Sequence, residues 1–134
     1  MAVFLGASAL LLGGCSPGSP ATDKDSLVRR VSAGLGEAGA AGPLTGCLTK
    51  DLADHLTEAD ADAAYEDLAS DPEVSEEALN QVSLAQSTVR ERLVSRARIC
   101  RRSLIAAGRY TQRELDRMLR RIGARGYRNP GLFL

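Results

Sequence analysis

Apolar side chains recur at intervals of three and four residues along most of the chain, a spacing that places them on one face of an α-helix. The first run includes Leu27, Val31 and Leu35. Either Asp25 or Ser26 can cap the helix that carries this run. Glycine and proline residues separate it from later runs. The pattern predicts helices over residues 25–38, 44–56, 58–69, 76–107 and 112–122.

The predicted helix starts rest on residues that favour the first turn. Thr57 and Asp60 have the spacing of a capping box, with Asp in place of the usual Glu or Gln. Thr111 and Glu114 form a second box of the usual type. Pro43 suits the first turn of a helix because its missing N–H has no intrahelical partner there.

The predicted helix ends rest on glycine and proline. The pair Asp71-Pro72 ends the third helix, because the residue before a proline avoids helical backbone angles. Gly108 closes the fourth helix, and Gly123 and Gly126 end the last one. Residues 127–134 are then expected to form a loop.

The fourth predicted helix is the longest and carries one continuous apolar stripe. Its members are separated by three or four positions if Gln86 is counted in the series. The stripe consists of Leu79, Val82, Val89, Leu93, Ala97, Cys100 and Leu104.

The composition also favours helices over strands. Aromatic residues make up 4% of the 134 residues and Trp is absent, whereas strands are enriched in aromatic and β-branched residues. No strand-like alternation of apolar and polar residues appears. The length suits one modest hydrophobic core. We therefore predict an all-α fold, a small helical domain of about five helices.

The N-terminal segment has the features of an export signal. Residues 2–12 carry no charge and form an apolar run too short to span a bilayer, which needs about 20 residues. The run ends in Leu12-Gly13-Gly14-Cys15. A small, polar segment with two prolines follows, which is typical of a flexible tether. No Lys or Arg precedes Cys15, which departs from the usual start of a signal peptide.

The sequence Leu12-Gly13-Gly14-Cys15 resembles the lipobox of bacterial lipoproteins. This resemblance implies that Cys15 receives a diacylglycerol on its sulfur and becomes the new N-terminus after cleavage. Residues 1–14 would then be a signal peptide, 15–24 a lipidated tether and 25–134 the helical domain. The alternative is an unmodified Cys in an apolar N-terminal segment. Lipidation would place the protein on the extracytoplasmic face of the cell membrane.

Two cysteines remain once Cys15 is assigned to a lipid. Cys47 and Cys100 lie on the apolar faces of different predicted helices, and an even number in an exported protein indicates a disulfide. Two separately buried thiols are the alternative. Each Cys also precedes a capped helix start, at Thr57 and at Thr111. This echo suggests two packed helix-turn-helix units joined by the disulfide, or a chance similarity of amphipathic helices.

Charge is distributed unevenly along a chain whose formal net charge is zero. Residues 1–77 hold fourteen acids and four bases, while residues 78–134 hold three acids and thirteen arginines. The first interpretation is that acidic and basic helices pack side by side. The second is an exposed basic face that contacts an anionic surface such as phospholipid. Its residues would be Arg109, Arg113, Arg117, Arg120 and Arg121. Nucleic acid is not expected as a partner of an exported protein.

Other chemical motifs lack the context they require. Gly34 to Gly39 matches G-x-G-x-x-G in letters, but no strand precedes it, so no dinucleotide cofactor is expected. His55 has no partners at metal-ligand spacing, although Asp51 and Asp54 are near it. We therefore expect no metal, no cofactor and no catalytic residue.

The expected function is accordingly binding rather than catalysis. The sequence suggests a membrane-anchored, non-catalytic binding or structural component of the bacterial cell envelope, with an envelope protein as a candidate partner. The alternative is a small envelope hydrolase or an anionic-ligand-binding protein, which would need a concave site.

Overall fold

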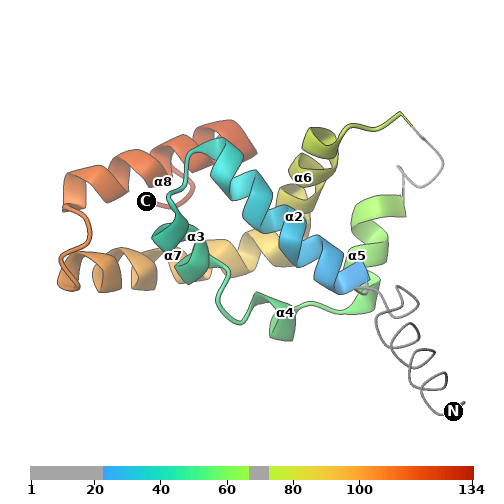
Figure 1. Ribbon diagram of the computed structural model, residues 1–134, viewed down its shortest axis with the longest axis horizontal. Coiled ribbons are helices and arrows are strands. Elements are labelled where there is room, and N and C mark those ends of the chain that lie inside the picture. The colour runs from blue at the N-terminus through green and yellow to red at the C-terminus, as the bar shows by residue number, and fades with distance from the viewer. Residues whose placement is uncertain (1–22, 67–72) are drawn as a thin grey trace, which may run out of the picture.

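The computed structural model describes residues 23–66 and 73–134, and its regular elements there are all helices (Figure 1). The predicted all-α class is confirmed, with no strand in these two ranges. The helices are α2 (Asp23–Ala38), α3 (Gly42–Leu48), α4 (Leu52–His55), α5 (Glu58–Tyr65), α6 (Glu76–Ala85), α7 (Ser87–Ala106) and α8 (Gln112–Tyr127).

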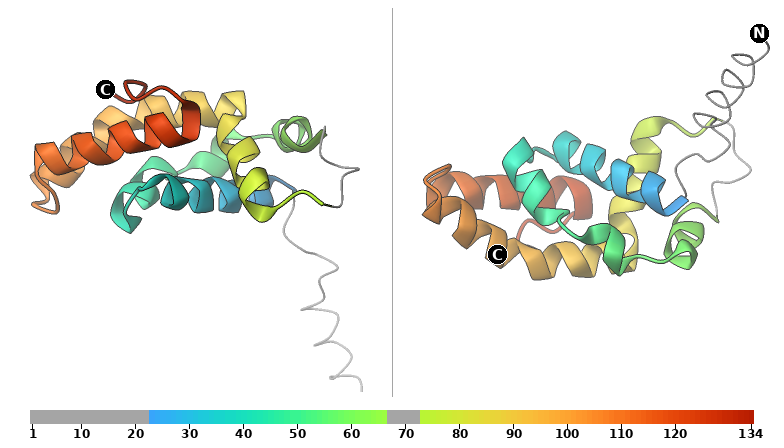
Figure 2. Two further views of the ribbon diagram at one scale, coloured as in Figure 1. Left: turned by 90° about the horizontal axis from the view of Figure 1, so that it is seen from above. Right: turned by 60° about the horizontal axis from the view of Figure 1, so that its bottom comes forward.

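Helices α7 and α8 form an antiparallel pair that packs against α2 and α3 (Figure 2). Helix α2 also contacts α4, α5 and α6, so most of the fold is assembled around it. Helices α5 and α6 lie at the end of the molecule where α2 begins, and the turn between α7 and α8 lies at the other end (Figure 1). Helices α2 and α8, which are far apart in the sequence, contact each other and share one core.

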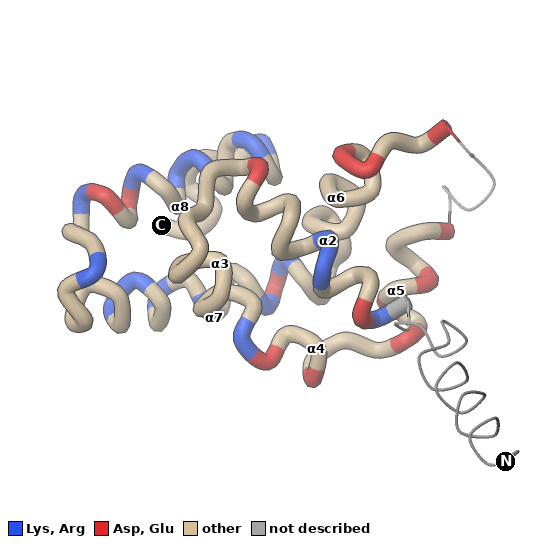
Figure 3. The backbone as a smooth tube through the Cα atoms, in the orientation of Figure 1, with Lys and Arg blue, Asp and Glu red and all other residues tan. Residues whose placement is uncertain are grey.

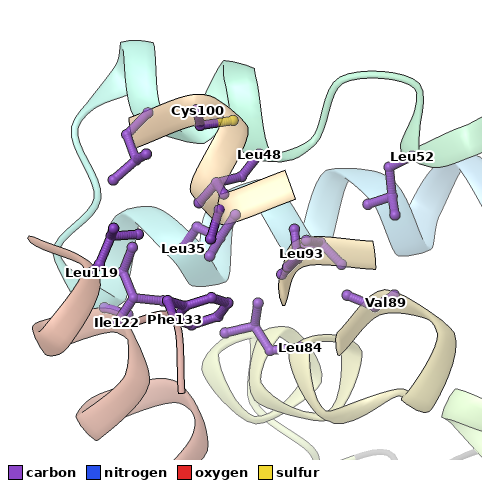
Figure 4. Close-up of a cluster of buried hydrophobic side chains, with 14 of the residues drawn as sticks. Leu35, Leu48, Leu52, Leu84, Val89, Leu93, Cys100, Leu119, Ile122 and Phe133 are labelled. Carbon is purple, nitrogen blue, oxygen red and sulfur yellow. The ribbon is translucent and has the colours of Figure 1, made fainter. Parts of the chain in front are cut away.

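The core is built mainly from leucine (Figure 4). Each of the helices α2 to α8 contributes to it, because each carries at least one buried side chain on its inward face. The largest fully buried side chains are Leu27, Val31, Leu35, Leu44, Leu48, Leu52, Leu84, Val89, Leu93, Leu115, Leu119 and Ile122. The helical spacing seen in the sequence therefore identifies most of this core.

The single helix expected over 76–107 is wrong, because the chain bends at Gln86. Gln86 ends α6 and caps α7, where its side chain accepts a 2.8 Å hydrogen bond from Val89 N. The α7 part of the predicted stripe, from Val89 to Leu104, is buried. On α6 the buried residues are Asn80, Ser83 and Leu84, whereas the predicted Leu79 and Val82 are half-buried. The bend thus turns a different face of α6 toward α2.

The helix expected over 44–56 is also divided. Helix α3 ends at Leu48, and Asp51 then adopts a left-handed conformation with φ of 59° before α4 begins. Asp enters this region more readily than most residues because its short side chain can satisfy nearby backbone groups. Leu52 and Leu56 still point into the core beyond the bend, so the apolar positions were correct although the helix was not continuous.

The last helix runs through Gly123 and Gly126 to Tyr127, so the expected end at the glycines is wrong. Gly123 instead lets the following segment fold back, because a side chain at this position would collide with the Asn129 carbonyl oxygen. Asn129 N donates a 2.9 Å hydrogen bond to Gly123 O. The tail expected to be a loop consequently packs on the helices, and only 7% of Phe133 is exposed.

The cap expected at Asp25 or Ser26 is wrong, because α2 already begins at Asp23 and contains both residues. The two predicted capping boxes and the helix end at Gly108 are confirmed. Thr57 and Asp60 form a capping box, as do Thr111 and Glu114. Gly108 ends the first helix of the α7–α8 pair with φ of 72°, a backbone conformation that glycine adopts without strain. These features depend on neighbours within a few residues, which explains why they are visible in the sequence.

Several predictions fall outside the described residues. These are the signal peptide over 1–14, Cys15, most of the tether, and the end of the third helix between Ala69 and Pro72. The last two residues of the predicted tether are described, and they already belong to α2, which begins at Asp23. Among the helices of the described ranges, none is long and apolar enough to cross a membrane.

Candidate anion-binding surface

Cys47 and Cys100 form the predicted disulfide, which joins α3 to α7. Their Cα atoms are 5.7 Å apart, and Cys100 is fully buried. Arg96 on α7 donates to the Cys47 carbonyl oxygen through Nε at 3.3 Å and through a terminal nitrogen at 3.2 Å. This arginine therefore satisfies a carbonyl at the C-terminal end of α3, in addition to the covalent link.

The arginines proposed as a basic face are exposed. Arg113, Arg117 and Arg120 line one depression along α8. Arg109 lies in the turn between α7 and α8, apart from this depression. The Arg121 side chain packs over the end of α2, where it covers Gly39. The structure thus brings three of the five residues together on one surface.

A second depression, of about 390 Å³, lies between α7, α8 and the C-terminal tail. Two arginines of α7, Arg98 and Arg101, line it together with Arg120 of α8. Sequence reasoning missed the α7 arginines because they are separated from α8 along the chain. Arg98 and Arg101 are three residues apart, which places both on one side of a helix, and this spacing could have indicated a second basic surface.

Arg101 and Asp116 form a two-point ion pair in this depression. Arg101 Nε lies 2.6 Å from Asp116 Oδ1, and a terminal nitrogen lies 3.3 Å from Oδ2. The Arg101 guanidinium lowers the pKa of Asp116, and the nearby Arg120 acts in the same direction. Asp116 therefore stays ionised at neutral pH and is oriented toward Arg101 rather than toward the exposed Arg98.

A third depression, of about 330 Å³, continues the second one along α7. The two share Arg98, Phe133 and Leu134. Val94, which is 37% exposed, and Leu134, which is 52% exposed, supply apolar surface here. We call the two adjoining depressions the arginine groove, lined by Val94, Ser95, Arg98, Arg101, Asp116, Arg120, Leu132, Phe133 and Leu134.

Most acidic residues of the described ranges lie away from this groove, although Asp116 lines it. They lie on α4, on α5 and at the start of α6, toward the end where α2 begins (Figure 3). Arg30 forms an ion pair with Glu76 at 2.7 Å, and Arg101 forms one with Asp116. Neither joins an acid of residues 1–77 to an arginine of residues 78–134. The interpretation that acidic and basic helices pack side by side stays a prediction, and the acidic α4 does contact the arginine-rich α7.

The remaining chemical candidates do not assemble a site. His55 is exposed, and its Nδ1 lies 2.9 Å from the backbone oxygen of Asp51 rather than from a carboxylate. Gly34 lies in α2, where Leu84 of α6 packs closely over it, so this glycine of the G-x-G-x-x-G match allows two helices to pack together. No group of three His, Cys, Asp or Glu side chains in the described part of the chain could hold a metal ion.

Comparisons with known proteins give no family for this chain. No family model matches it, and neither a curated protein nor a solved structure matches it.

Proposed function

We propose that this protein is a lipid-anchored, extracytoplasmic component of the bacterial cell envelope that acts by binding. The observation that carries the proposal is the order of features at the N-terminus. An uncharged apolar run is followed by Leu12-Gly13-Gly14-Cys15 and then by a small, polar segment. This order resembles the export and lipidation signal of bacterial lipoproteins, and it makes the membrane a partner through Cys15.

The disulfide supports the same location. Disulfides persist in oxidising compartments outside the cytoplasm and are rare inside it. Cys47 and Cys100 are joined, which leaves Cys15 as the one remaining cysteine of the chain. One lipid-modified cysteine together with one disulfide is the pattern that we expect of an exported lipoprotein.

The surface supports binding of an anionic partner. Exposed arginines line α8 and the arginine groove, and each basic side chain near an anionic membrane surface contributes about 1 kcal/mol of attraction. An acidic envelope protein is a further candidate partner. The rival function as a small hydrolase needs convergent titratable groups, and the environment of His55 does not supply them.

The mass of the mature protein tests the location. The full chain is produced in a bacterial host with its N-terminal segment intact, and the membrane fraction is analysed by mass spectrometry. We expect a chain that begins at Cys15 and carries a diacylglycerol on that residue. The Cys15→Ser variant should keep its N-terminal segment and lose the lipid, while its disulfide forms as before.

Two results would contradict the proposal. One is cell-associated protein that starts at an unmodified Met1. The other is a wild-type chain that fractionates with soluble cytosolic proteins in the same way as Cys15→Ser.

A further inference from the structure

The arginine groove places cationic and apolar surface side by side. Arg98, Arg101 and Arg120 line one part of it, and Val94, Leu132 and Leu134 line the adjoining part. Phe133, which is largely buried, belongs to both parts and forms a fixed apolar floor. A ligand that occupies both parts would combine an anionic group with an apolar segment in one molecule.

The ion pair inside the groove determines which arginines are open to a ligand. Both oxygens of Asp116 receive hydrogen bonds from Arg101, so this carboxylate and this guanidinium largely neutralise each other. Arg98 and Arg120 flank the pair and are exposed. A guanidinium donates two parallel hydrogen bonds to a phosphate more readily than an ammonium does. Two guanidinium groups are thus available for one anionic headgroup.

The apolar part of the groove would contact the hydrocarbon portion of a ligand. Val94 and Leu134 line the same depression and are 37% and 52% exposed, so both offer apolar surface to a ligand. Covering them removes apolar area from water and contributes favourably to binding. Because Arg98 lines both depressions, a headgroup beside Arg98 would direct its attached chain toward Leu134.

We propose that the arginine groove binds an anionic phospholipid, with the phosphate between Arg98 and Arg120 and the first part of an acyl chain along Val94, Phe133 and Leu134. An acidic peptide without large apolar side chains matches the charges but leaves the apolar part of the groove uncovered. This inference deepens the proposed binding role and rests on it for the source of the lipid.

Titration of the full chain with alkyl phosphates tests the site directly. Calorimetry at physiological salt would compare inorganic phosphate, butyl phosphate, hexyl phosphate and octyl phosphate. We expect affinity to rise by roughly fourfold for each methylene that becomes buried. Octyl phosphate that binds no more tightly than inorganic phosphate would overturn the proposal and leave only a non-specific anion site.

Variants separate the groove from the rest of the basic surface. Arg98→Gln combined with Arg120→Gln should weaken octyl phosphate binding by roughly thirtyfold. The matched control, Arg113→Gln combined with Arg117→Gln, removes the same charge from α8 and should change the affinity by less than about threefold. Equal losses in the two double variants would also overturn the proposal. Thermal unfolding of each variant verifies that the fold is retained.

Two further measurements distinguish a lipid from an acidic peptide as the ligand, and groove binding from lipid anchoring at Cys15. A decaglutamate peptide that displaces octyl phosphate at lower concentration than hexyl phosphate would contradict a lipid ligand and indicate an acidic protein partner. The full-length Cys15→Ser chain should bind octyl phosphate as the wild type does. Loss of the lipid anchor and loss of the groove are therefore separate outcomes.

Discussion

Gln86 Nε2 donates a 3.2 Å hydrogen bond to Asp60 Oδ1, which joins α5 to the bend between α6 and α7. The same carboxylate also accepts hydrogen bonds from Thr57 N at 2.8 Å and from Thr88 Oγ1 at 3.1 Å. Gln86 Oε1 meanwhile caps α7 at Val89 N. One pair of side chains thus ends one helix, begins another and holds a third beside them.

Replacing Gln86 should therefore destabilise the protein. Gln86→Ala removes the cap of α7 and the bond to Asp60, and we expect the free energy of unfolding to fall by about 1–2 kcal/mol. Urea denaturation followed by circular dichroism measures the change. Gln112→Ala, at the exposed start of α8, is the control with an expected change below about 0.5 kcal/mol. An unchanged urea midpoint for Gln86→Ala would show that the bend does not need this side chain.

Asp60 should make stability depend on acid pH. The hydrogen bond from the Thr57 backbone and those from Thr57, Thr88 and Gln86 side chains lower the pKa of Asp60 below its ordinary value of 3.8. The unfolded chain then binds a proton at higher pH than the folded chain does. The stabilisation is present above pH 4 and is lost as the pH falls through the folded-state pKa.

Asp60→Asn tests this pH dependence. The variant should be less stable than the wild type at pH 6, and the difference should shrink below pH 4 as the wild-type carboxylate becomes protonated. Urea midpoints measured between pH 6 and pH 2.5 would show the convergence. A constant difference over that range would mean that the ionised form of Asp60 has no special role.

The disulfide should supply a large share of the stability. Cys47 and Cys100 are separated by 53 positions, and closing a loop of this length stabilises the folded state by about 4 kcal/mol through the entropy of the unfolded chain. Denaturation with and without a reductant measures the loss. The double variant Cys47→Ala and Cys100→Ala should match the reduced wild type, while Cys15→Ala should not change stability. Two titratable thiols at Cys47 and Cys100 in the unreduced protein would contradict the bridge.

Two glycines of α2 should respond to alanine with opposite signs. A Cβ atom at Gly34 would lie 2.9 Å from Leu84 Cδ1 and 3.2 Å from Asn80 O, so Gly34→Ala should cost about 1–3 kcal/mol by overpacking. Gly36 faces open space, and Gly36→Ala should stabilise the helix by up to about 1 kcal/mol. Thermal unfolding of the two variants checks the signs. A stabilised Gly34→Ala would mean that α2 and α6 do not cross at this point.

Local features of this protein follow from the sequence alone. The capping boxes at Thr57 and Thr111 and the helix end at Gly108 involve partners within a few residues, so their chemistry is complete in a short segment. The helical spacing of leucines identifies the core, because one helix face is buried wherever the helix packs. The disulfide could also be predicted from the number of cysteines. The chain has three, and assigning Cys15 to a lipid leaves Cys47 and Cys100 to pair.

Packing between distant segments decided the rest. Glutamine is not a residue type that usually ends a helix. The bend at Gln86 is held by the hydrogen bonds of its side chain to Asp60 and to Val89 N. Gly123 and Gly126 stay helical because the tail and Leu84 pack closely over them. The arginine groove depends on the pairing of α7 with α8 and on the buried Phe133, which bring Arg98, Arg120 and Leu134 together across long separations in the chain. Spacing along one helix cannot specify such a site, because its geometry is set by how separate elements pack.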